Sequence, residues 1–247
     1  MLDERRRRYL QAMGITLWAP RHPLPGMADA PTPVAPAPPA GEAVLPTASA
    51  GDERNAAIAR MDWQQLRAAV AACTACPLHR SRTRPVFGVG DTEAALMIIG
   101  EAPGAEEDRQ GEPFVGRAGK LLDAMLKALG LERRQVFIAN ILKSRPPNNR
   151  DPLPEEVEAC WPFLARQIAL VQPRLILAVG RIAAQRLLRT EVPVGRLRGR
   201  VHRLPDHDIP LVVTYHPAYL LRNPRDKGKA WEDLQLAWHT WRERQPS

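Results

Sequence analysis

The stretch LMIIGEAPGAEEDRQGEPFVGRAGKLL, residues 96–122, has a strand, loop and helix pattern that indicates an α/β fold. Its apolar start, 96–99, has the length and composition of a buried strand. Acids and glycines follow, and helical spacing of apolar residues returns over 118–129. An open α/β sheet binds its ligand where a strand passes through such a loop into a helix. The loop is not a phosphate-binding P-loop, because Phe114 and Leu121 stand where that motif has Gly and Ser or Thr.

Strand and helix patterns continue to alternate after this stretch. Apolar runs at 136–142, 175–179 and 211–214 predict three more buried strands, and the alternating residues 196–204 predict an edge ribbon. The fold predicted is a three-layer α/β/α domain around a mostly parallel four-stranded sheet, whose functional loops converge at one edge. Helices are predicted at 57–72, 118–129, 154–171 (with a kink at Pro162), 181–188 and 227–242 (with Trp231, Leu234, Trp238 and Trp241 facing inward).

The amino-terminal part of the sequence differs from the rest in composition. Residues 1–19 predict a short basic helix or tail, and 20–52 predict a Pro/Ala-rich linker, with nine prolines between 20 and 46. The folded domain is expected at 53–247.

Bulk properties narrow the class of protein. The net charge of +8 favours a polyanionic partner. Three cysteines, an odd number, indicate a reducing compartment rather than a disulfide framework. We find no apolar run of transmembrane length and no signal peptide, so we expect a cytoplasmic protein without a membrane partner.

Four motifs carry a family resemblance. They are GEAPG at 100–104, GEPFVGRAG at 111–119, Asn140 followed by KSRPPNNR at 143–150, and HPA at 216–218. Together they resemble the uracil-DNA glycosylase superfamily, most closely its family 4, the bacterial and archaeal iron–sulfur branch, over about residues 70–245. The resemblance implies a DNA repair hydrolase that flips uracil out of DNA, cleaves its N-glycosidic bond and leaves an abasic site.

The residue types suit that chemistry. Phe114 would stack on the flipped base, and Asn140 can offer a carbonyl and an amide to N3–H and O4 of uracil. His216 could donate to O2 as negative charge develops there. Glu101 could orient the attacking water or balance the sugar cation, and Glu107 is a weaker candidate for the same role.

Other residues would bind the base and the DNA. Pocket N–H groups are expected from Ala102 and Gly104. An apolar side chain, Leu220 or Leu221, would fill the gap left by the base, unless both begin the core of the last helix. Phosphates are expected to meet Arg117, Lys120, Lys143, Arg145, Arg150 and Arg222.

The resemblance also implies a [4Fe–4S] cluster, with one departure from the family pattern. Cys73, Cys76 and Cys160 match three of its four cysteines, but the fourth position is Ser144. A hydroxyl is a harder ligand than a thiolate, so cluster binding should weaken. Three outcomes remain open: a four-iron cluster with Ser144 or an outside ligand, a three-iron cluster, and no cluster.

Two other classes of function are considered. A catalytically weak DNA-binding or repair-recruitment module could keep the same motifs, although intact Glu101, Asn140 and His216 argue against it. A nucleotide hydrolase would need a glycine-rich loop that binds phosphate, and no such loop follows any of the predicted strands. We expect a bacterial, nucleoid-associated monomer that acts on single- or double-stranded uracil-containing DNA, with a possible protein partner for the N-terminal helix.

Overall fold

The computed structural model describes residues 50–243. The predicted basic helix at 1–19 and most of the predicted linker lie outside the described residues. The predicted domain start at residue 53 falls inside helix α2 (Ala50–Ile58), which therefore begins in the segment predicted as linker.

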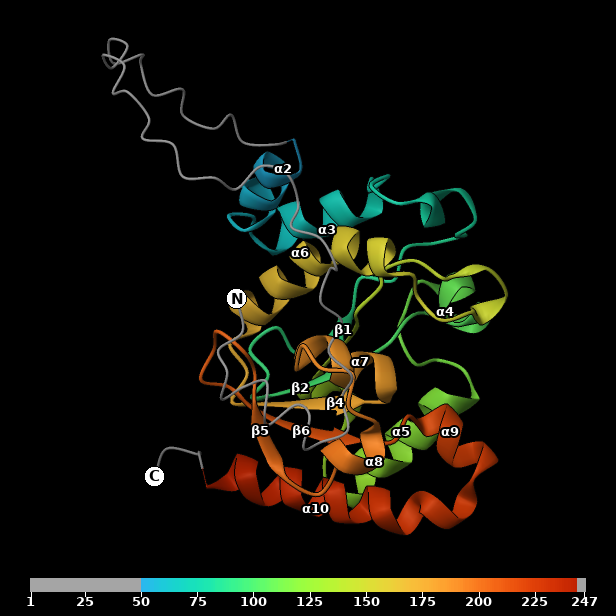
Figure 1. Cartoon of the computed structure of the whole chain (residues 1–247), viewed down its shortest axis with the longest axis vertical. Coiled ribbons are helices and arrows are strands. Elements are labelled where there is room, and N and C mark those ends of the chain that lie inside the picture. The colour runs from blue at the N-terminus through green and yellow to red at the C-terminus, as the bar shows by residue number, and fades with distance from the viewer. Residues whose placement is uncertain (1–49, 244–247) are drawn as a thin grey trace, which may run out of the picture. The chain divides into compact units, whose positions relative to one another are not determined.

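A six-stranded sheet with the order β1-β3-β2-β4-β6-β5 lies at the centre of the domain (Figure 1). Its four inner strands are parallel: β3 (Phe137–Asn140), β2 (Leu96–Gly100), β4 (Leu175–Val179) and β6 (Pro210–Thr214). The α/β class and the parallel core are confirmed, but the predicted strand number is wrong. Two short antiparallel edge strands, β1 (Val89–Gly90) and β5 (Val201–Arg203), were not counted because neither forms an apolar run. The strand β5 lies within the predicted edge ribbon.

Helices cover both faces of the sheet (Figure 1). Side chains alternate between the faces along each inner strand: Met97 and Ile99 pack with helices α6 and α7, whereas Ile98 packs with α5 and α10. The longer helices are α3 (Trp63–Ala71), α5 (Arg117–Ala128), α6 (Pro154–Val171), α7 (Arg181–Leu187) and α10 (Lys227–Arg242). The shorter ones are α4 (Ala105–Gln110), α8 (Val194–Leu197), α9 (Pro217–Arg222), η1 (Pro77–Arg80), η2 (Arg133–Gln135), η3 (Pro147–Asn149) and η4 (Pro224–Asp226).

Three helical details differ from the prediction. The single helix predicted at 57–72 is two helices, because Asp62 starts α3 with a capping box in which its carboxylate accepts from Gln65 N at 2.8 Å. The predicted acidic loop contains α4. Trp231 is 40% exposed, because the buried stripe of α10 is Ala230, Leu234 and Ala237.

The register of the parallel strands aligns their carboxyl ends. Gly100 pairs with Asn140, and Val179 pairs with Thr214. The residues that follow β2, β3, β4 and β6 therefore meet along one edge of the sheet, as the sequence predicted for the functional loops.

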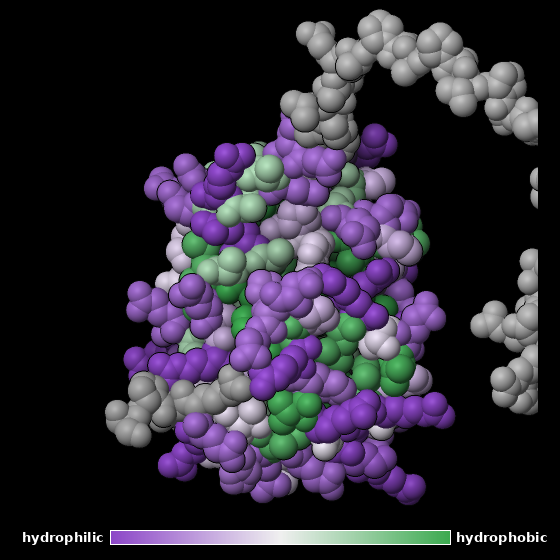
Figure 2. Space-filling model, turned by 60° about the vertical axis from the view of Figure 1, so that its left-hand side comes forward, coloured by the Kyte–Doolittle hydropathy of each residue, from purple (hydrophilic) through white to green (hydrophobic). Residues whose placement is uncertain are grey.

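The surface is mainly polar. Figure 2 shows a face dominated by hydrophilic residues, with hydrophobic ones in small separate areas. Within residues 50–243, no helix is long and apolar enough to cross a membrane.

Candidate active site

The predicted pocket residues converge at the carboxyl edge of the sheet. A Cβ atom on Gly100 would lie 2.5 Å from Asn140 Oδ1 and 2.6 Å from Phe114 Cζ, so both side chains reach the end of β2. The rings of Phe114 and His216 have centroids 5.6 Å apart. A Cβ on Gly180, after β4, would lie 2.9 Å from His216 Cβ. Glycine at these two positions leaves room for the three side chains.

Asn140 presents an unused acceptor. The residue is 2% exposed, and its Oδ1 has no hydrogen-bond partner in the described part of the chain. A buried polar atom without a partner is costly, and native proteins keep such atoms mainly where a ligand or water completes the bond. The orphan oxygen can accept a hydrogen bond from a ligand or a water molecule.

Phe114 lies in the loop between α4 and α5. It is 6% exposed and has a φ of 55°, in the left-handed region that non-glycine residues rarely adopt. Its carbonyl oxygen lies where a Cβ on Gly119 would be only 1.7 Å away, so Gly119 permits the close approach of the loop to α5. Such strained residues cluster at ligand sites.

His216 caps helix α9 in a defined tautomer. Its Nδ1 accepts the N–H of Ala218 at 3.1 Å, so in the neutral ring the proton is on Nε2. Burial lowers the pKa of His216 to about 4 and Arg222 adds to the shift, while Glu107 opposes it. The imidazole is therefore neutral near pH 7, and its Nε2–H can donate a hydrogen bond.

Glu101 follows β2 directly. Burial raises its pKa to about 7; Asp151 adds to the rise and Arg181 opposes it. A carboxyl group that titrates near neutrality can take a proton from water, so the raised pKa and the position directly after β2 suit a general base. The sequence reasoning missed Asp151 and Arg181, although Gly180-Arg181 stands at the end of β4 much as Gly100-Glu101 stands at the end of β2.

Glu107 has a different role from the one predicted. Its Oε2 accepts the N–H of Gly104 at 3.1 Å, and its Oε1 accepts those of Val115 at 3.0 Å and Gly116 at 3.1 Å. A carboxylate that holds three main-chain N–H groups braces the loop, so the contacts contradict its use as a water-activating group. They also occupy the N–H that we had assigned to base binding at Gly104. Ala102, beside Glu101, is half-buried.

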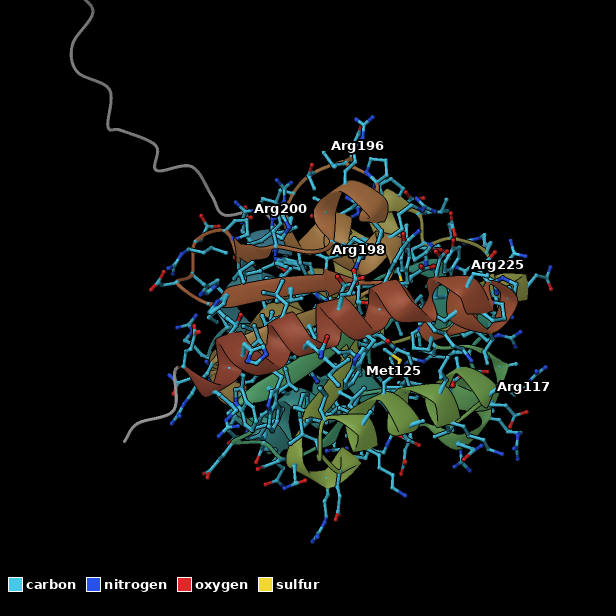
Figure 3. All side chains as sticks on the ribbon, turned by 90° about the horizontal axis from the view of Figure 1, so that it is seen from below. Arg117, Met125, Arg196, Arg198, Arg200 and Arg225 are labelled. Carbon is cyan, nitrogen blue, oxygen red and sulfur yellow. The ribbon has the colours of Figure 1, made fainter. Side chains whose placement is uncertain are left out.

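The predicted phosphate contacts separate into two groups. Arg117, Lys120 and Arg222 are exposed. Figure 3 shows Arg117 at one end of the domain together with Arg225, which the sequence reasoning missed, and Met125 between α5 and α10. The prediction for Lys143 is wrong: it is 2% exposed, and its Nζ donates to Asn140 O at 2.8 Å and to Gln167 Oε1 at 2.6 Å.

The other two arginines are held by the protein. Arg145 donates to Asn149 Oδ1 at 2.8 Å, and Arg150 pairs with the buried Glu156 at 2.5 Å. Their hydrogen bonds brace the Pro/Asn-rich turn, which makes them weaker candidates for phosphate contacts.

The two leucines after the His216 motif also separate. Leu220 is 1% exposed and packs in the core with α5 and α10, so its assignment as a wedge is wrong. Leu221 is 36% exposed and is the one of the pair that can enter a base stack.

The three cysteines lie near one another. Burial raises the pKa of Cys160 to about 11, and the thiols of Cys76 and Cys73 contribute to the rise, so the three lie within electrostatic reach of one another. Cys160 Sγ accepts from Lys143 N at 3.5 Å, and Ser144 Oγ accepts from Arg82 Nη1 at 3.0 Å. Across residues 50–243, no three His, Cys, Asp or Glu side chains are close enough to hold a single metal ion. A four-iron cluster is wider than one ion, so this finding concerns single ions, and Ser144, where the family pattern has its fourth cysteine, has its hydroxyl bound by Arg82.

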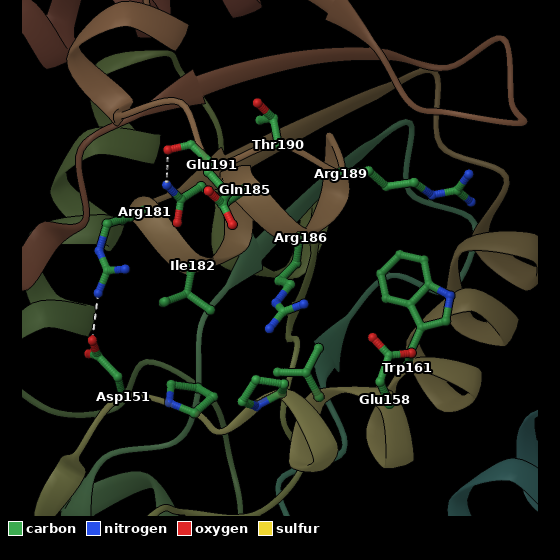
Figure 4. Close-up of a pocket in the computed structure, with 13 residues that line it drawn as sticks. Asp151, Glu158, Trp161, Arg181, Ile182, Gln185, Arg186, Arg189, Thr190 and Glu191 are labelled. Carbon is green, nitrogen blue, oxygen red and sulfur yellow. Dashed lines mark hydrogen bonds and ion pairs between the residues drawn. The ribbon is translucent and has the colours of Figure 1, made fainter. Parts of the chain in front are cut away.

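A hollow of about 740 Å³ lies beside Glu101, between α6 and α7. Figure 4 shows Arg181 reaching Asp151, at 2.5 Å, while Arg186 of α7 and Arg189, in the turn after α7, lie opposite Glu158 and Trp161. Its three arginines are matched by three acids, Asp151, Glu158 and Glu191, so its charge does not select an anion. Neither Phe114 nor Asn140 lines this hollow.

Comparisons with known proteins agree with this arrangement. The profile of the Uracil DNA glycosylase superfamily matches residues 87–235. The chain is 45% identical over 182 residues to a type-4 uracil-DNA glycosylase of Pyrobaculum aerophilum, covering 71% of this chain and 93% of that protein. It is 41% identical over 184 residues to that of Archaeoglobus fulgidus (72% and 92% covered). It is also 45% identical over 172 residues to that of Thermotoga maritima (68% and 88% covered).

Proposed function

The chain belongs to the uracil DNA glycosylase superfamily and, within it, to the type-4 family, and from that premise we propose that it removes uracil from DNA by hydrolysing the N-glycosidic bond. The observation that carries the proposal is the orphan acceptor Asn140 Oδ1 beside Phe114 and His216. A flat base with one N–H between two carbonyl groups satisfies all three side chains.

The first step is recognition of the flipped base. Uracil N3–H donates to Asn140 Oδ1, and Asn140 Nδ2 donates to uracil O4. Cytosine reverses that pattern, with an acceptor at N3 and an amino group at C4, so a fixed Asn140 rejects it. The ring of Phe114 stacks on the base and adds affinity without selecting among bases.

Bond cleavage builds charge on both fragments. The bond between C1′ of the sugar and N1 of uracil breaks, and its electron pair leaves with the base. Neutral His216 donates from Nε2 to uracil O2, where negative charge grows. A water molecule attacks C1′, and Glu101 accepts its proton, so the base leaves as the uracil anion. Glu101 then releases this proton to solvent and the anion takes one up, which gives an abasic sugar and uracil.

The rate should depend on pH through Glu101. Because only the ionised carboxylate can accept the proton and its pKa is about 7, kcat/KM is expected to rise with pH up to about 7 and then to level off. His216, with a pKa of about 4, stays neutral over this range. Glu101→Gln should lower the rate by about 10²-fold or more and remove the rise of the rate with pH. A single-turnover profile from pH 5 to 9 tests this, and a wild-type rate that is flat or falls with pH contradicts the role of Glu101.

The exposed residues around the pocket would hold the DNA. Arg117, Lys120 and Arg222 are exposed and would meet phosphates, which fix the position of the strand without reading its sequence. Leu221, 36% exposed, would enter the stack that the flipped base leaves.

The finer proposal for the cofactor is a [4Fe–4S] cluster on Cys73, Cys76 and Cys160, with Ser144 at the fourth position. The cluster would be structural: it would tie the segment before the sheet, which carries Cys73 and Cys76, to α6. No step of the reaction depends on it.

Ser144→Cys tests this proposal. A thiolate is softer and more easily ionised than a hydroxyl, so the variant should hold more iron per chain and absorb more strongly in the charge-transfer region after purification without oxygen. Iron content and visible spectra are the measurements. Ser81→Cys is the matched control, because Ser81 precedes Arg82 in the chain and its hydroxyl donates to Leu78 O. The cluster proposal fails if neither protein holds iron after anaerobic reconstitution. The assignment of Ser144 fails if the native chain already holds four irons and the variant changes nothing.

A substrate series tests the proposed function. Single-stranded oligonucleotides that contain one uracil, cytosine or thymine are incubated with the protein and then with alkali, which cleaves at an abasic site. We expect cleavage with uracil only, with no metal or nucleotide added. Equal cleavage of uracil and cytosine would contradict the role of Asn140.

A further inference from the structure

Arg133 bonds to the main chain of the loop that carries Phe114. Its Nη1 donates to Phe114 O at 3.2 Å, and its Nη2 donates to Pro113 O. The same guanidinium pairs with Asp123 of α5 at 3.2 Å, and its side chain is 25% exposed. One arginine thus holds two consecutive carbonyl groups in a fork, which is the geometry that a guanidinium provides and an ammonium does not.

Phe114 needs such support because its backbone conformation is unfavourable. With φ at 55°, it is one of the non-glycine residues in the left-handed region. Such a residue keeps this conformation only where its surroundings impose it. The carbonyl group that turns toward α5 and Gly119 in this conformation is the one that Arg133 binds.

Opposite charges hold the two sides of Phe114. Arg133 binds the carbonyl groups of residues 113 and 114, and Glu107 binds the N–H groups of Val115 and Gly116. Arg133 belongs to η2, directly before β3, the strand that ends at Asn140. The segment that carries Arg133 therefore holds the loop with the aromatic ring, and it leads into the strand that carries the base-binding amide.

We infer that Arg133 is a positioning residue, which sets the ring of Phe114 for the flipped base without touching that base. The inference rests on the proposed function, because it assigns Phe114 the stacking role. Without Arg133 the loop can relax, and the ring leaves the end of β2.

A double-mutant cycle separates this role from a general structural one. The variants are Arg133→Met, Phe114→Ala and the two together, with uracil release and binding to DNA that contains an abasic site measured for each. Stacking stabilises the bound base equally before and during bond cleavage. Loss of stacking should therefore raise KM and leave kcat unchanged. Abasic DNA has no base to stack, so its affinity should stay within about twofold.

The expected result is strong coupling between the two positions. Phe114→Ala should raise KM about tenfold or more, the range of one base stack on an aromatic ring. Arg133→Met should raise KM by up to the same factor. The KM of the double variant should lie within about twofold of the KM of Phe114→Ala alone. Arg133→Lys should lie between wild type and Arg133→Met, because its single ammonium cannot bind both carbonyl groups in a fork.

The matched control is Arg134→Met, since the neighbouring Arg134 is 81% exposed and pairs with Glu132. It should leave KM unchanged. The inference is overturned if the effects of Arg133→Met and Phe114→Ala multiply, or if abasic-DNA affinity falls with KM. If Arg133→Met does not fold, Arg133→Lys takes its place in the cycle with the same criteria. An inactive wild type contradicts the proposed function instead, so the two failures are distinguishable.

Discussion

His216→Ala is expected to slow bond cleavage by roughly 10²–10³, the usual effect of removing one donor to a developing oxyanion. The reason lies in the state of the ring: its Nδ1 accepts from Ala218 N at 3.1 Å, and its pKa of about 4 keeps it neutral. A neutral donor holds the growing charge on uracil O2 without giving up a proton. Single-turnover release of uracil, with enzyme in excess, measures this step directly.

DNA binding separates a catalytic from a structural role of His216. Phosphate contacts dominate affinity for DNA, so His216→Ala should bind a uracil-containing strand about as well as wild type. His239→Ala is the matched control, because His239 is exposed on α10. If binding and cleavage fall by the same factor in His216→Ala, the assignment of His216 is contradicted.

Asn140→Asp is expected to lower uracil release by about 10²–10³ and to permit slow release of cytosine. The change replaces the Nδ2 donor with an acceptor, which leaves uracil O4 facing an oxygen and matches the amino group of cytosine. Two mismatched buried groups cost roughly 3–4 kcal/mol in total, and each 1.36 kcal/mol is tenfold in rate. Paired assays on uracil and cytosine strands test this.

Asn148→Asp provides the control for added negative charge near the DNA, because Asn148 is exposed in the turn after β3. It should change neither rate by more than about twofold, as expected for a surface site. Asn140 does not read the base if Asn140→Asp lowers uracil release and the melting temperature together and shows no gain on cytosine.

Local patterns in the sequence determined most of the fold. The runs at 96–99 and 175–179 are buried strands because apolar residues fill both faces of a covered parallel sheet. Strand β5 has the exposure typical of an edge strand, with Val201 43% exposed, so its sequence contains no apolar run that would predict a buried strand. The break between α2 and α3 had a signal, the Asp62 and Gln65 of a capping box.

The candidate site was harder to predict, because burial and partners come from tertiary packing. Asn140 and His216 follow strands, and topology alone brings them together. Lys143 reads as a phosphate contact in the sequence, but α6 covers it and supplies Gln167 as its partner. In the same way, no local pattern shows that Glu107 binds three N–H groups or that Leu220 packs in the core. The monomeric state, the bacterial nucleoid location and a partner for residues 1–19 stay predictions.

Release of free uracil by the wild-type protein under single-turnover conditions tests the central claim most directly. A strand with one uracil is mixed with excess protein and a chelator such as EDTA, and free base and abasic sites are counted over time, with His216→Ala as the blank. We predict equal amounts of uracil and abasic sites, at a rate at least about 10² above that blank. Uracil release no faster than in buffer, by protein that still binds the strand, would contradict the account and favour a repair-recruitment module.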